Sequence, residues 1–339
     1  MSYRRFDQDD IVVSADSITS PAWSNSSVQL TSFHTSSQVS ADSGKYYYSI
    51  YNNGDAATQE IQFSVAYGNK LGSGSALYDA GVLGKSYSST VYGQFRTLIN
   101  GDEDTNFTFD NNGTLETPDS IYALSIQRAR YKEKLLPGSL FLKLKGNVTG
   151  KIATLHLTDN SKNLISDTFT DAGRVYSLYS ASAAGEVHST SVEYGKMYPD
   201  VGTIILNAEM LSSSNYLDVG AGALASFTGS NYSTHNHNLN LVNSLNSGSQ
   251  FVLRSDETLT SNFIFVRARN SEFNYSTNPS NITGSGELRH SVMIDNPQSY
   301  LTQVGLYNDS NDLLAVAKLS TPLLKDFTKE TLIRIKLDY

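Results

Sequence analysis

The chain of 339 residues carries 25 basic and 33 acidic residues, which gives a formal net charge of -8. This excess of acid argues against a general attraction of the molecule to nucleic acid or to an anionic membrane. The chain contains no cysteine, which excludes disulfides, thiolate metal sites and cysteine nucleophiles and fits assembly in a reducing cytoplasm. No window approaches the ~20 apolar residues that span a bilayer, so we expect a soluble protein.

The composition is polar but poor in charge. Charged residues make up only 17% of the chain, and there are 21 tyrosines. Tyrosine offers a large contact area with a polar tip, which suits surfaces that assemble. The same residues are also common in β-rich proteins with many turns. Both interpretations stay open.

The N-terminal part is predicted to be an extended arm, or a set of loosely paired strands, that leads into a hairpin. Residues 1–44 are rich in serine and threonine, and Trp23 is the expected anchor of this arm. Residues 46–51 and 61–67 then have strand patterns, with the turn 52–55 between them. A β-hairpin is therefore expected from residue 46 onward.

Two segments after the hairpin show apolar residues at helical spacing. The first, near 87–99, has Val91, Phe95 and Leu98 on one side. The second, at 119–135, follows Pro118 and ends before a proline and a glycine. These patterns predict two helices.

Alternating apolar residues dominate the rest of the chain. They predict a β-meander in the middle, strands with one short helix further on, and a final meander that ends the chain. The middle strands are expected at 140–144, 153–157 and 164–169. The later elements are strands at 201–206, 263–268 and 288–294, a helix at 237–245, and meander strands at 301–307, 313–319 and 332–339.

These elements predict an α+β protein that is mostly β, with antiparallel meanders, a few helices in the N-terminal half, and two or three lobes. The expected bounds are 1–138 for the arm with an α+β lobe, 139–210 for a β-meander lobe, and 211–339 for a C-terminal β-rich module.

The acidic loop 102–110 is the best candidate for a metal site. Oxygen-bearing side chains alternate there as in a calcium loop: Asp102, Asp104, Asn106, Thr108 and Asp110. However, the sixth position is Phe107 where calcium loops need glycine, and the twelfth is Gly113 where they place a bidentate glutamate. We favour an acidic, solvated loop, and whether it binds a metal stays open.

The histidines and one basic cluster are the other polar features of note. His235 and His237 would share one face of a strand but not of a helix, and no third ligand stands nearby. His290 falls on an apolar strand face, where a hydrogen-bonded core or interface histidine is expected. The cluster Arg128, Arg130, Lys132 and Lys134 favours a solvated helix face paired with acidic neighbours, with phosphate contact as the alternative.

The sequence patterns of catalysis are missing. Gly72-Ser73-Gly74 lacks the third glycine and the lysine of a phosphate-binding loop, so a tight turn is expected. There is no Gly-x-Ser-x-Gly nucleophile elbow. The Asn-x-Ser/Thr triplets at Asn106 and Asn274 are interpreted as chance matches. We predict no catalytic, cofactor-binding or metal-ligating residues.

Six segments, spread over most of the chain, carry a resemblance to known proteins. They are FSVAYGNKLGSGS (63–75), VYGQFRTLING (91–101), SIYALSIQRARYKEKLLPGSLFLKLKG (120–146), YGKMYPDVGTIILN (194–207), FVRARNSEFNYSTNPS (265–280) and VGLYNDSNDLLAVAKLSTPL (304–323). They resemble a family of virion structural proteins of T-even-like contractile-tailed phages, especially those of marine cyanobacteria. The segment from Gly305 to Ala317 is also similar to the opening modules of tail-fibre and baseplate proteins, where a hairpin docks a subunit.

The resemblance implies a non-enzymatic building block of the tail or baseplate that works by symmetric assembly. Its implied partners are other tail, baseplate or neck subunits, fibres, and further copies of itself in the virion, which is assembled in the host cytoplasm. It implies neither a membrane nor a specific nucleic acid as a partner. The alternatives are a receptor- or glycan-binding tail protein, and a polysaccharide-cleaving tail enzyme, for which the sequence marks no carboxylate pair.

Overall fold

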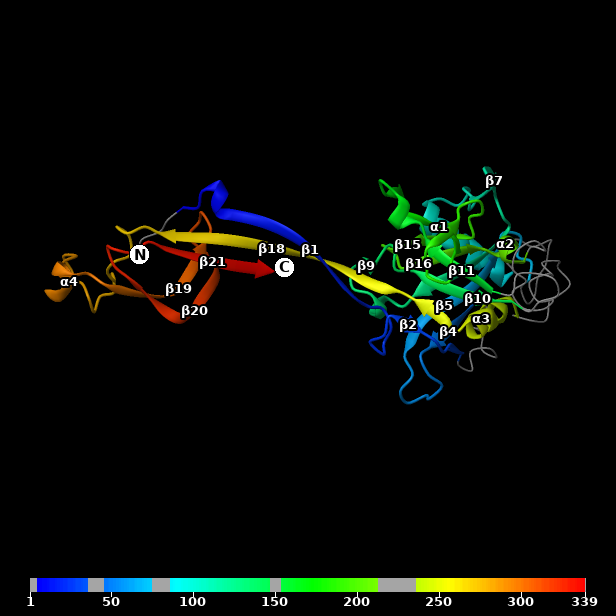
Figure 1. Cartoon of the computed structure of the whole chain (residues 1–339), viewed down its shortest axis with the longest axis horizontal. Coiled ribbons are helices and arrows are strands. Elements are labelled where there is room, and N and C mark those ends of the chain that lie inside the picture. The colour runs from blue at the N-terminus through cyan, green and yellow to red at the C-terminus, as the bar shows by residue number, and fades with distance from the viewer. Residues whose placement is uncertain (1–4, 36–45, 75–85, 147–153, 213–235, 339) are drawn as a thin grey trace. The chain divides into compact units, whose positions relative to one another are not determined.

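The computed structural model describes residues 5–35, 46–74, 86–146, 154–212 and 236–338. The chain divides into two compact units, a larger one of residues 18–257 and a smaller one that combines 1–17 with 258–339. The predicted fold class is confirmed, because the protein is α+β and mostly β (Figure 1). The strand pairs whose residue register is defined are antiparallel. The sequence-based boundaries after residues 138 and 210 both fall inside the larger unit.

The larger unit is built on one antiparallel sheet of 13 strands. Along its main path the strands run in the order β2 (Gln29–Leu30), β17 (Gln250–Val252), β10 (Phe141–Lys145), β11 (Thr154–Asp159), β13 (Gly173–Ala181), β15 (Gly195–Tyr198), β16 (Thr203–Asn207), β8 (Ser120–Ile126), β5 (Ile61–Asn69), β4 (Tyr47–Tyr51) and β3 (His34–Thr35). Off this path, β12 (Thr168–Thr170) and β14 (Val187–Ser189) pair with β13, and β6 (Phe109–Asn111) forms a separate ribbon with β7 (Thr114–Glu116).

The sheet curls so that strands far apart in its order share one core. The rings of Phe63 on β5 and Phe251 on β17 lie 5.3 Å apart, although six strands separate β5 from β17 along the path. Helix α3 (Asn236–Gly248) contacts β10 and β17, which lie near one end of the strand order. It also contacts β4 and β5, which lie near the other end. The large apolar cluster therefore lies inside the curl, where Leu142, Leu157, Ile204 and Leu241 are fully buried.

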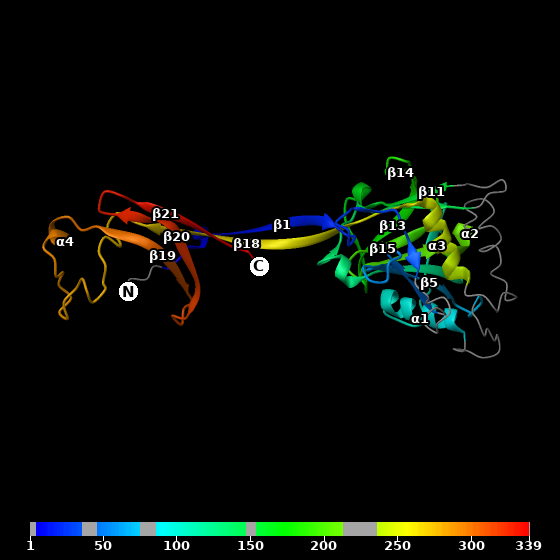
Figure 2. The same ribbon diagram turned by 90° about the horizontal axis from the view of Figure 1, so that it is seen from below.

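Helix α1 (Tyr87–Asn100) covers the opposite face of the sheet and confirms the helix predicted near 87–99. On β8, Ile121 and Ala123 join the cluster beneath α1, whereas Tyr122 and Leu124 join the core inside the curl. Figures 1 and 2 show α1 and α3 on different sides of β5. The short helix α2 (Ala208–Ser212) follows β16 directly.

The helix predicted at 119–135 is wrong. Residues 120–126 form β8, a 3-10 turn follows at η4 (Arg128–Arg130), and β9 (Lys134–Leu135) ends the segment. Because β8 lies between β5 and β16 and is buried on both faces, its run of apolar residues has no clear period of two. A fully buried strand of this kind can match helical spacing by chance.

Several strand predictions are confirmed, with one change in the middle meander. The hairpin β4–β5, the pair β10–β11 and the helix near 237–245 are all present. The third strand of the meander is β13 and not 164–169, where a 3-10 turn, η5 (Ser161–Asn163), precedes the short strand β12. Ile165 and Phe169 are exposed, so this segment has no core to join.

The smaller unit contains the second sheet. Strands β1 (Ile11–Pro21), β18 (Arg254–Ala268) and β21 (Thr331–Asp338) are neighbours in it, and β9 also pairs with β18 within the larger unit. Strands β19 (Ser299–Tyr307) and β20 (Leu313–Lys325) form a separate hairpin. The predicted final meander is therefore wrong in one respect, because the last strand pairs with β18 and not with β20.

Two further elements of this unit are short. A 3-10 turn, η1 (Gln8–Asp10), precedes β1. The strand predicted at 288–294 is wrong, because residues 292–295 form the helical turn α4 (Val292–Asp295). Val292 and Ile294 are exposed there, and the backbone N–H groups of residues 293–296 bond to carbonyls three or four residues back.

Candidate docking surface

The sheet of the smaller unit has one apolar face. Strands β18 and β21 pair in register from Ser261 opposite Asp338 to Ala268 opposite Thr331. Because side chains alternate along a strand, Ile264 shares a face with Ile333 and Ile335. All three are buried, which confirms that the last strand contributes to a core, and Leu337 packs against it while partly buried.

The β19–β20 hairpin packs on this face, but the core it closes is small. The buried cluster consists of Ile264, Leu306, Ile333 and Ile335, and the apolar side chains around it are only partly buried. A cluster of four side chains is a small core for a unit of this length. The smaller unit thus leaves much of its apolar surface in contact with solvent.

Many large apolar side chains of the smaller unit are exposed. They are Phe6, Ile11, Val12, Val13, Tyr275, Val292, Ile294, Tyr300, Leu313, Leu314, Val316, Leu323, Phe327 and Leu332. The exposed fraction is 74% at Val292, 68% at Leu314 and 63% at Val13. Exposed apolar residues that gather in one region are typical of interaction surfaces.

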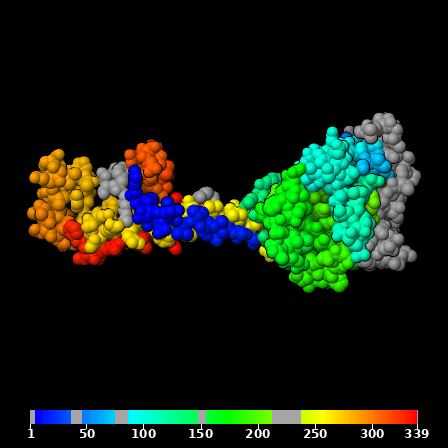
Figure 3. Space-filling model, turned by 90° about the horizontal axis from the view of Figure 1, so that it is seen from above, coloured from blue at the N-terminus to red at the C-terminus, as the bar shows by residue number. Residues whose placement is uncertain are grey.

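Strand β1 is exposed on both of its faces. Ile11, Val12 and Val13 follow one another, so at least one of them points to each face, and all three are exposed. The space-filling view shows this blue N-terminal segment uncovered on the face that it displays (Figure 3). Within the part of the chain that the structure describes, no strand pairs with the outer edge of β1 or with that of β21. Free edges of this kind can accept a strand from another chain.

The outer face near β21 is cationic. The guanidinium of Arg334 lies 5.5 Å from the ring centre of Phe263, and the ammonium of Lys336 lies 5.9 Å from it. Lys336 also forms an ion pair with Asp338 at 2.9 Å. Arg334 has no ion pair among the described residues and is exposed. β21 therefore presents positive charge beside its free edge.

A buried lysine fixes the loop that follows β18. The Lys325 side chain is 0% exposed, and its ammonium donates to the Asn274 Oδ1 at 2.7 Å. It also donates to the backbone oxygens of Asn270 at 3.1 Å and Asp326 at 2.9 Å. Three oxygen acceptors replace the water that the ammonium loses on burial. This contact ties residues 270–274 to the end of β20.

In the larger unit, Trp23 anchors the segment that follows β1, as predicted. It is 3% exposed, and its indole N–H donates to the backbone oxygens of Val28 and Phe251, each at 3.1 Å. Its ring also contacts Phe63 and Phe251. With Ala22, Leu30 and Phe33 buried beside it, this part of the chain belongs to the core and is not a loose arm.

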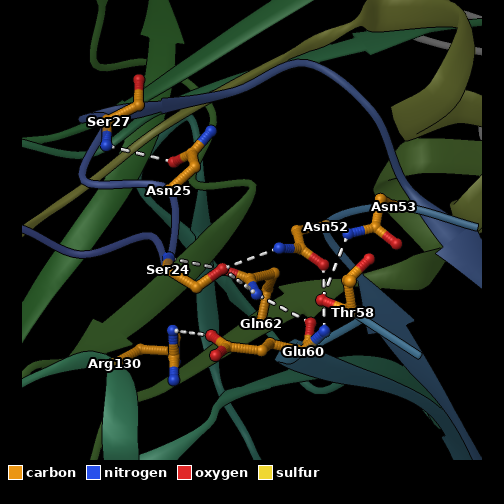
Figure 4. Close-up of polar contacts among 9 residues, drawn as sticks. All are labelled: Ser24, Asn25, Ser27, Asn52, Asn53, Thr58, Glu60, Gln62 and Arg130. Atoms are coloured by element: carbon orange, nitrogen blue, oxygen red, sulfur yellow. Dashed lines mark hydrogen bonds and ion pairs between the residues drawn. The ribbon is translucent and has the colours of Figure 1, made fainter. Parts of the chain in front are cut away.

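A polar network next to Trp23 holds the same segment (Figure 4). The Gln62 amide accepts from the Ser24 backbone N–H at 3.0 Å and donates to the Ser24 hydroxyl at 2.8 Å. Asn52 donates to that hydroxyl at 3.0 Å and accepts from the Glu60 N–H at 2.9 Å. Glu60 in turn pairs with Arg130 at 2.9 Å. These groups partner one another, which indicates a structural role.

In the 102–110 loop, the carboxylate of Asp102 is hydrogen-bonded by other residues of the same loop. Asp102 accepts from the backbone N–H and the hydroxyl of Thr105 and from the N–H of Asp104, and these bonds lower its pKa. Asp110 accepts from the Gly113 N–H at 2.7 Å. No group of three or more His, Asp or Glu side chains that could hold a metal ion occurs among the described residues. Metal binding by this loop stays a question for experiment.

The histidines are not brought together in the described residues. His235 lies outside them, and His237 is in the first turn of α3, not on a strand. Its ring stacks on Tyr67 at 4.5 Å, and burial lowers its pKa to about 4. The prediction for His290 is wrong: it precedes α4 and is exposed, because no strand forms there.

The basic cluster 128–134 pairs with acidic neighbours, although it does not lie on a helix. Lys132 contacts Glu257 at 2.6 Å, and Lys134, which is buried, contacts Asp256 at 3.4 Å. Arg128 lies over the ring of Tyr131 at 4.7 Å. This pairing supports the structural interpretation of the cluster.

The glycine loop and the two triplets are also structural. Gly72 and Gly74 both have positive φ, which confirms a turn at this point. A Cβ on Gly74 would lie 2.6 Å from the His237 ring, so the loop approaches α3 closely. Asn274 is buried against Lys325, and Phe107 is buried beneath α1.

Comparisons with known protein families, with characterised proteins and with solved structures found no match to this chain. Among the described residues, no helix is long and apolar enough to cross a membrane. The unpaired outer edges of β1 and β21, together with the exposed apolar side chains of the smaller unit, form the candidate functional surface.

Proposed function

We propose that this chain is a non-enzymatic structural subunit of a tailed-phage virion, positioned in the tail or baseplate, and that it works by docking neighbouring subunits. The virion and contractile-tail context comes from the resemblance of its sequence segments to that family. Its partners would be other tail, baseplate or neck subunits, fibres and further copies of the chain, and it would be located in the virion after assembly in the host cytoplasm.

The observation that carries this proposal is the uncovered surface of the smaller unit. Among the residues that the structure describes, its core holds four buried side chains, while β1 and the β19–β20 hairpin expose apolar residues such as Val13 and Leu314. A monomer gains nothing from this arrangement, because exposed apolar strand edges favour aggregation. A subunit that buries the same surface against neighbours gains stability from each contact.

Quantitative mass spectrometry of purified contractile-tailed particles tests this function. We expect the chain at a fixed ratio to known tail proteins, and at a ratio that survives a high-salt wash. Its absence from particles made in cells that express it would contradict the proposal.

A receptor- or glycan-binding tail protein is the second candidate. The exposed Tyr275 and Tyr300 support it, because aromatic rings on a surface can stack on sugars. Glycan-array binding that is lost in the double variant Tyr275→Ala and Tyr300→Ala, with particle assembly unchanged, would favour this second function.

A further inference from the structure

We propose that the outer edge of β1 in one copy of this chain pairs with the outer edge of β21 in a second copy. The inference rests on the proposed assembly role and deepens it, because it names the partner and the two edges that meet. Both edges belong to the smaller unit, where they close the two sides of the sheet β1-β18-β21.

The two edges match in length and in backbone character. Residues 11–17 of β1 lie in the smaller unit, and β21 spans Thr331–Asp338. Neither stretch contains a proline, and no bulge interrupts the pairing of β21 with β18. Proline and bulges are two devices that keep edge strands from pairing. β21, which has neither, and β1, which has no proline in this stretch, therefore each offer a row of backbone donors and acceptors to a further strand.

The side chains on the β1 edge are suited to burial. Ile11, Val12 and Val13 have high strand propensity and are exposed on both faces of the sheet. Leu332 on β21 is also exposed, with an exposed fraction of 57%. Pairing of the two edges would bring these apolar side chains beside a neighbouring strand and remove them from water.

The charges on the two edges favour pairing of β1 with β21 over the two symmetric alternatives, which are β1 with β1 and β21 with β21. Asp7, Asp9 and Asp16 lie exposed on or just before β1; Arg5 precedes them, and no lysine or arginine follows it until residue 45. β21 instead exposes Arg334 and Lys336 beside its edge, and although Asp338 pairs with Lys336, Arg334 leaves this strand with a net positive charge. Two β1 edges would place acid against acid, and two β21 edges would place base against base. A β1 edge against a β21 edge places opposite charges across the new ladder.

This arrangement is head-to-tail, since every copy offers one edge of each kind. A contact of this type generates a ring where the rotation closes and a filament where it does not. The second copy then supplies the strand that each sheet edge lacks.

A charge swap tests which groups meet. Asp16→Lys and Arg334→Glu should each weaken self-association roughly fivefold in sedimentation velocity, because each replaces an attractive cross-strand pair by a repulsive one. The double variant with both changes should regain most of the wild-type affinity. Asp309→Lys, at an exposed turn position between β19 and β20, is the matched control and should leave association unchanged.

Cross-linking tests which edges meet, and the chain has no native cysteine to interfere. Ser14 shares a face of β1 with Asp16, and Leu332 shares a face of β21 with Arg334, so a protein with Ser14→Cys is mixed with a protein with Leu332→Cys, and a short bismaleimide is added. We expect cross-linked dimers in the mixture and none with either protein alone. Dimers within either single preparation would show a symmetric pairing and would overturn the proposal.

The remaining outcomes separate this proposal from the proposed function. Self-association with the expected charge and cross-link pattern, in a protein absent from virions, would sustain the edge pairing and remove the virion role. A chain that is present in virions but stays monomeric at the highest concentration reached would overturn the edge pairing, and a different protein would then cover these edges.

Discussion

Trp23 joins three separate parts of the larger unit through one side chain. Its N–H bonds to Val28 and Phe251, and its ring packs on Phe63. Trp23→Phe should therefore lower the free energy of unfolding by about 1–3 kcal/mol, because the buried Phe251 carbonyl oxygen and the half-buried Val28 carbonyl oxygen each lose a donor. Trp23→Ala should lower it by about 3–5 kcal/mol through the cavity it leaves.

Denaturant unfolding followed by circular dichroism measures these changes for the unit that contains Trp23. Phe169→Ala is the control, because Phe169 is exposed and its loss should change stability by less than about 0.5 kcal/mol. A loss of stability in Trp23→Ala no larger than that of the control would show that the segment after β1 is not part of the core.

His237 makes the larger unit sensitive to acid. Its pKa is lowered to about 4 in the folded state by burial, whereas in an unfolded chain it lies near 6.5. As the pH falls, the unfolded state therefore takes up a proton on His237 before the folded state does. The free energy of unfolding is unaffected by this group above about pH 6.5 and decreases as the pH falls toward 4. The full loss is on the order of 3 kcal/mol.

The His237→Phe variant should lose this part of the pH dependence, because phenylalanine can stack on Tyr67 but cannot take up a proton. Unfolding free energies at pH 7, 5.5 and 4.5 check this, with the exposed His188→Gln as control. Equal pH profiles for wild type and His237→Phe would mean that the imidazole is not buried in the folded chain.

The Lys325 side chain holds the loop at residues 270–274 against the end of β20 through its hydrogen bonds. Lys325→Met should leave the Asn274 side chain and two backbone oxygens without a donor in a buried place, at a cost of roughly 1–3 kcal/mol. Hydrogen exchange of residues 270–280 should then speed up while residues of α1 keep their protection. Unchanged exchange of this loop would contradict the role given to the ammonium.

At the scale of elements, β21 is the strand on which the smaller unit depends. Deleting residues 331–339 removes the whole partner ladder of residues 261–268 and two of the four buried core side chains. We expect the smaller unit to unfold, because each aliphatic side chain contributes roughly 1.5–3 kcal/mol in a domain whose stability is about 5–15 kcal/mol. The deletion of residues 1–6 is the control and should leave the melting transition in place.

The elements that the sequence predicts are those whose residue types alternate or repeat clearly. The helix α1 has a clear helical period, and β5 alternates Phe63, Val65 and Tyr67 with smaller or polar residues although it is buried on both faces. The strand β8 is also buried on both faces, but its apolar residues do not alternate in this way, so a helix was predicted in its place. The pairing of β21 with β18 joins segments far apart in sequence, which the local preference for adjacent strands cannot reveal.

The sequence predicts only part of the candidate functional surface. The final strand was predicted to be built into a sheet, and it is. The sequence does not predict the role of β1, because its apolar residues lie within a stretch rich in serine and threonine, and their exposure depends on which strand lies beside them. The buried position of Lys325 was also missed, because a single lysine at the end of a strand is normally exposed.

At the scale of the whole molecule, the two units make different contributions. The larger unit has an extended core inside its curled sheet, whereas the smaller unit has a small core and free apolar edges. This difference predicts that the isolated chain is stable through its larger unit and that the smaller unit is stabilised by assembly. The melting transition of the smaller unit should therefore rise with protein concentration, while that of the larger unit should not.

A cryo-EM map of the intact contractile-tailed particle tests the proposed role most directly. We expect this chain in the tail or baseplate in symmetric copies, with β1 of each copy against β21 of the next and the exposed apolar side chains of the smaller unit covered by neighbours. A particle map that accounts for every tail and baseplate density without this chain would contradict the proposed role.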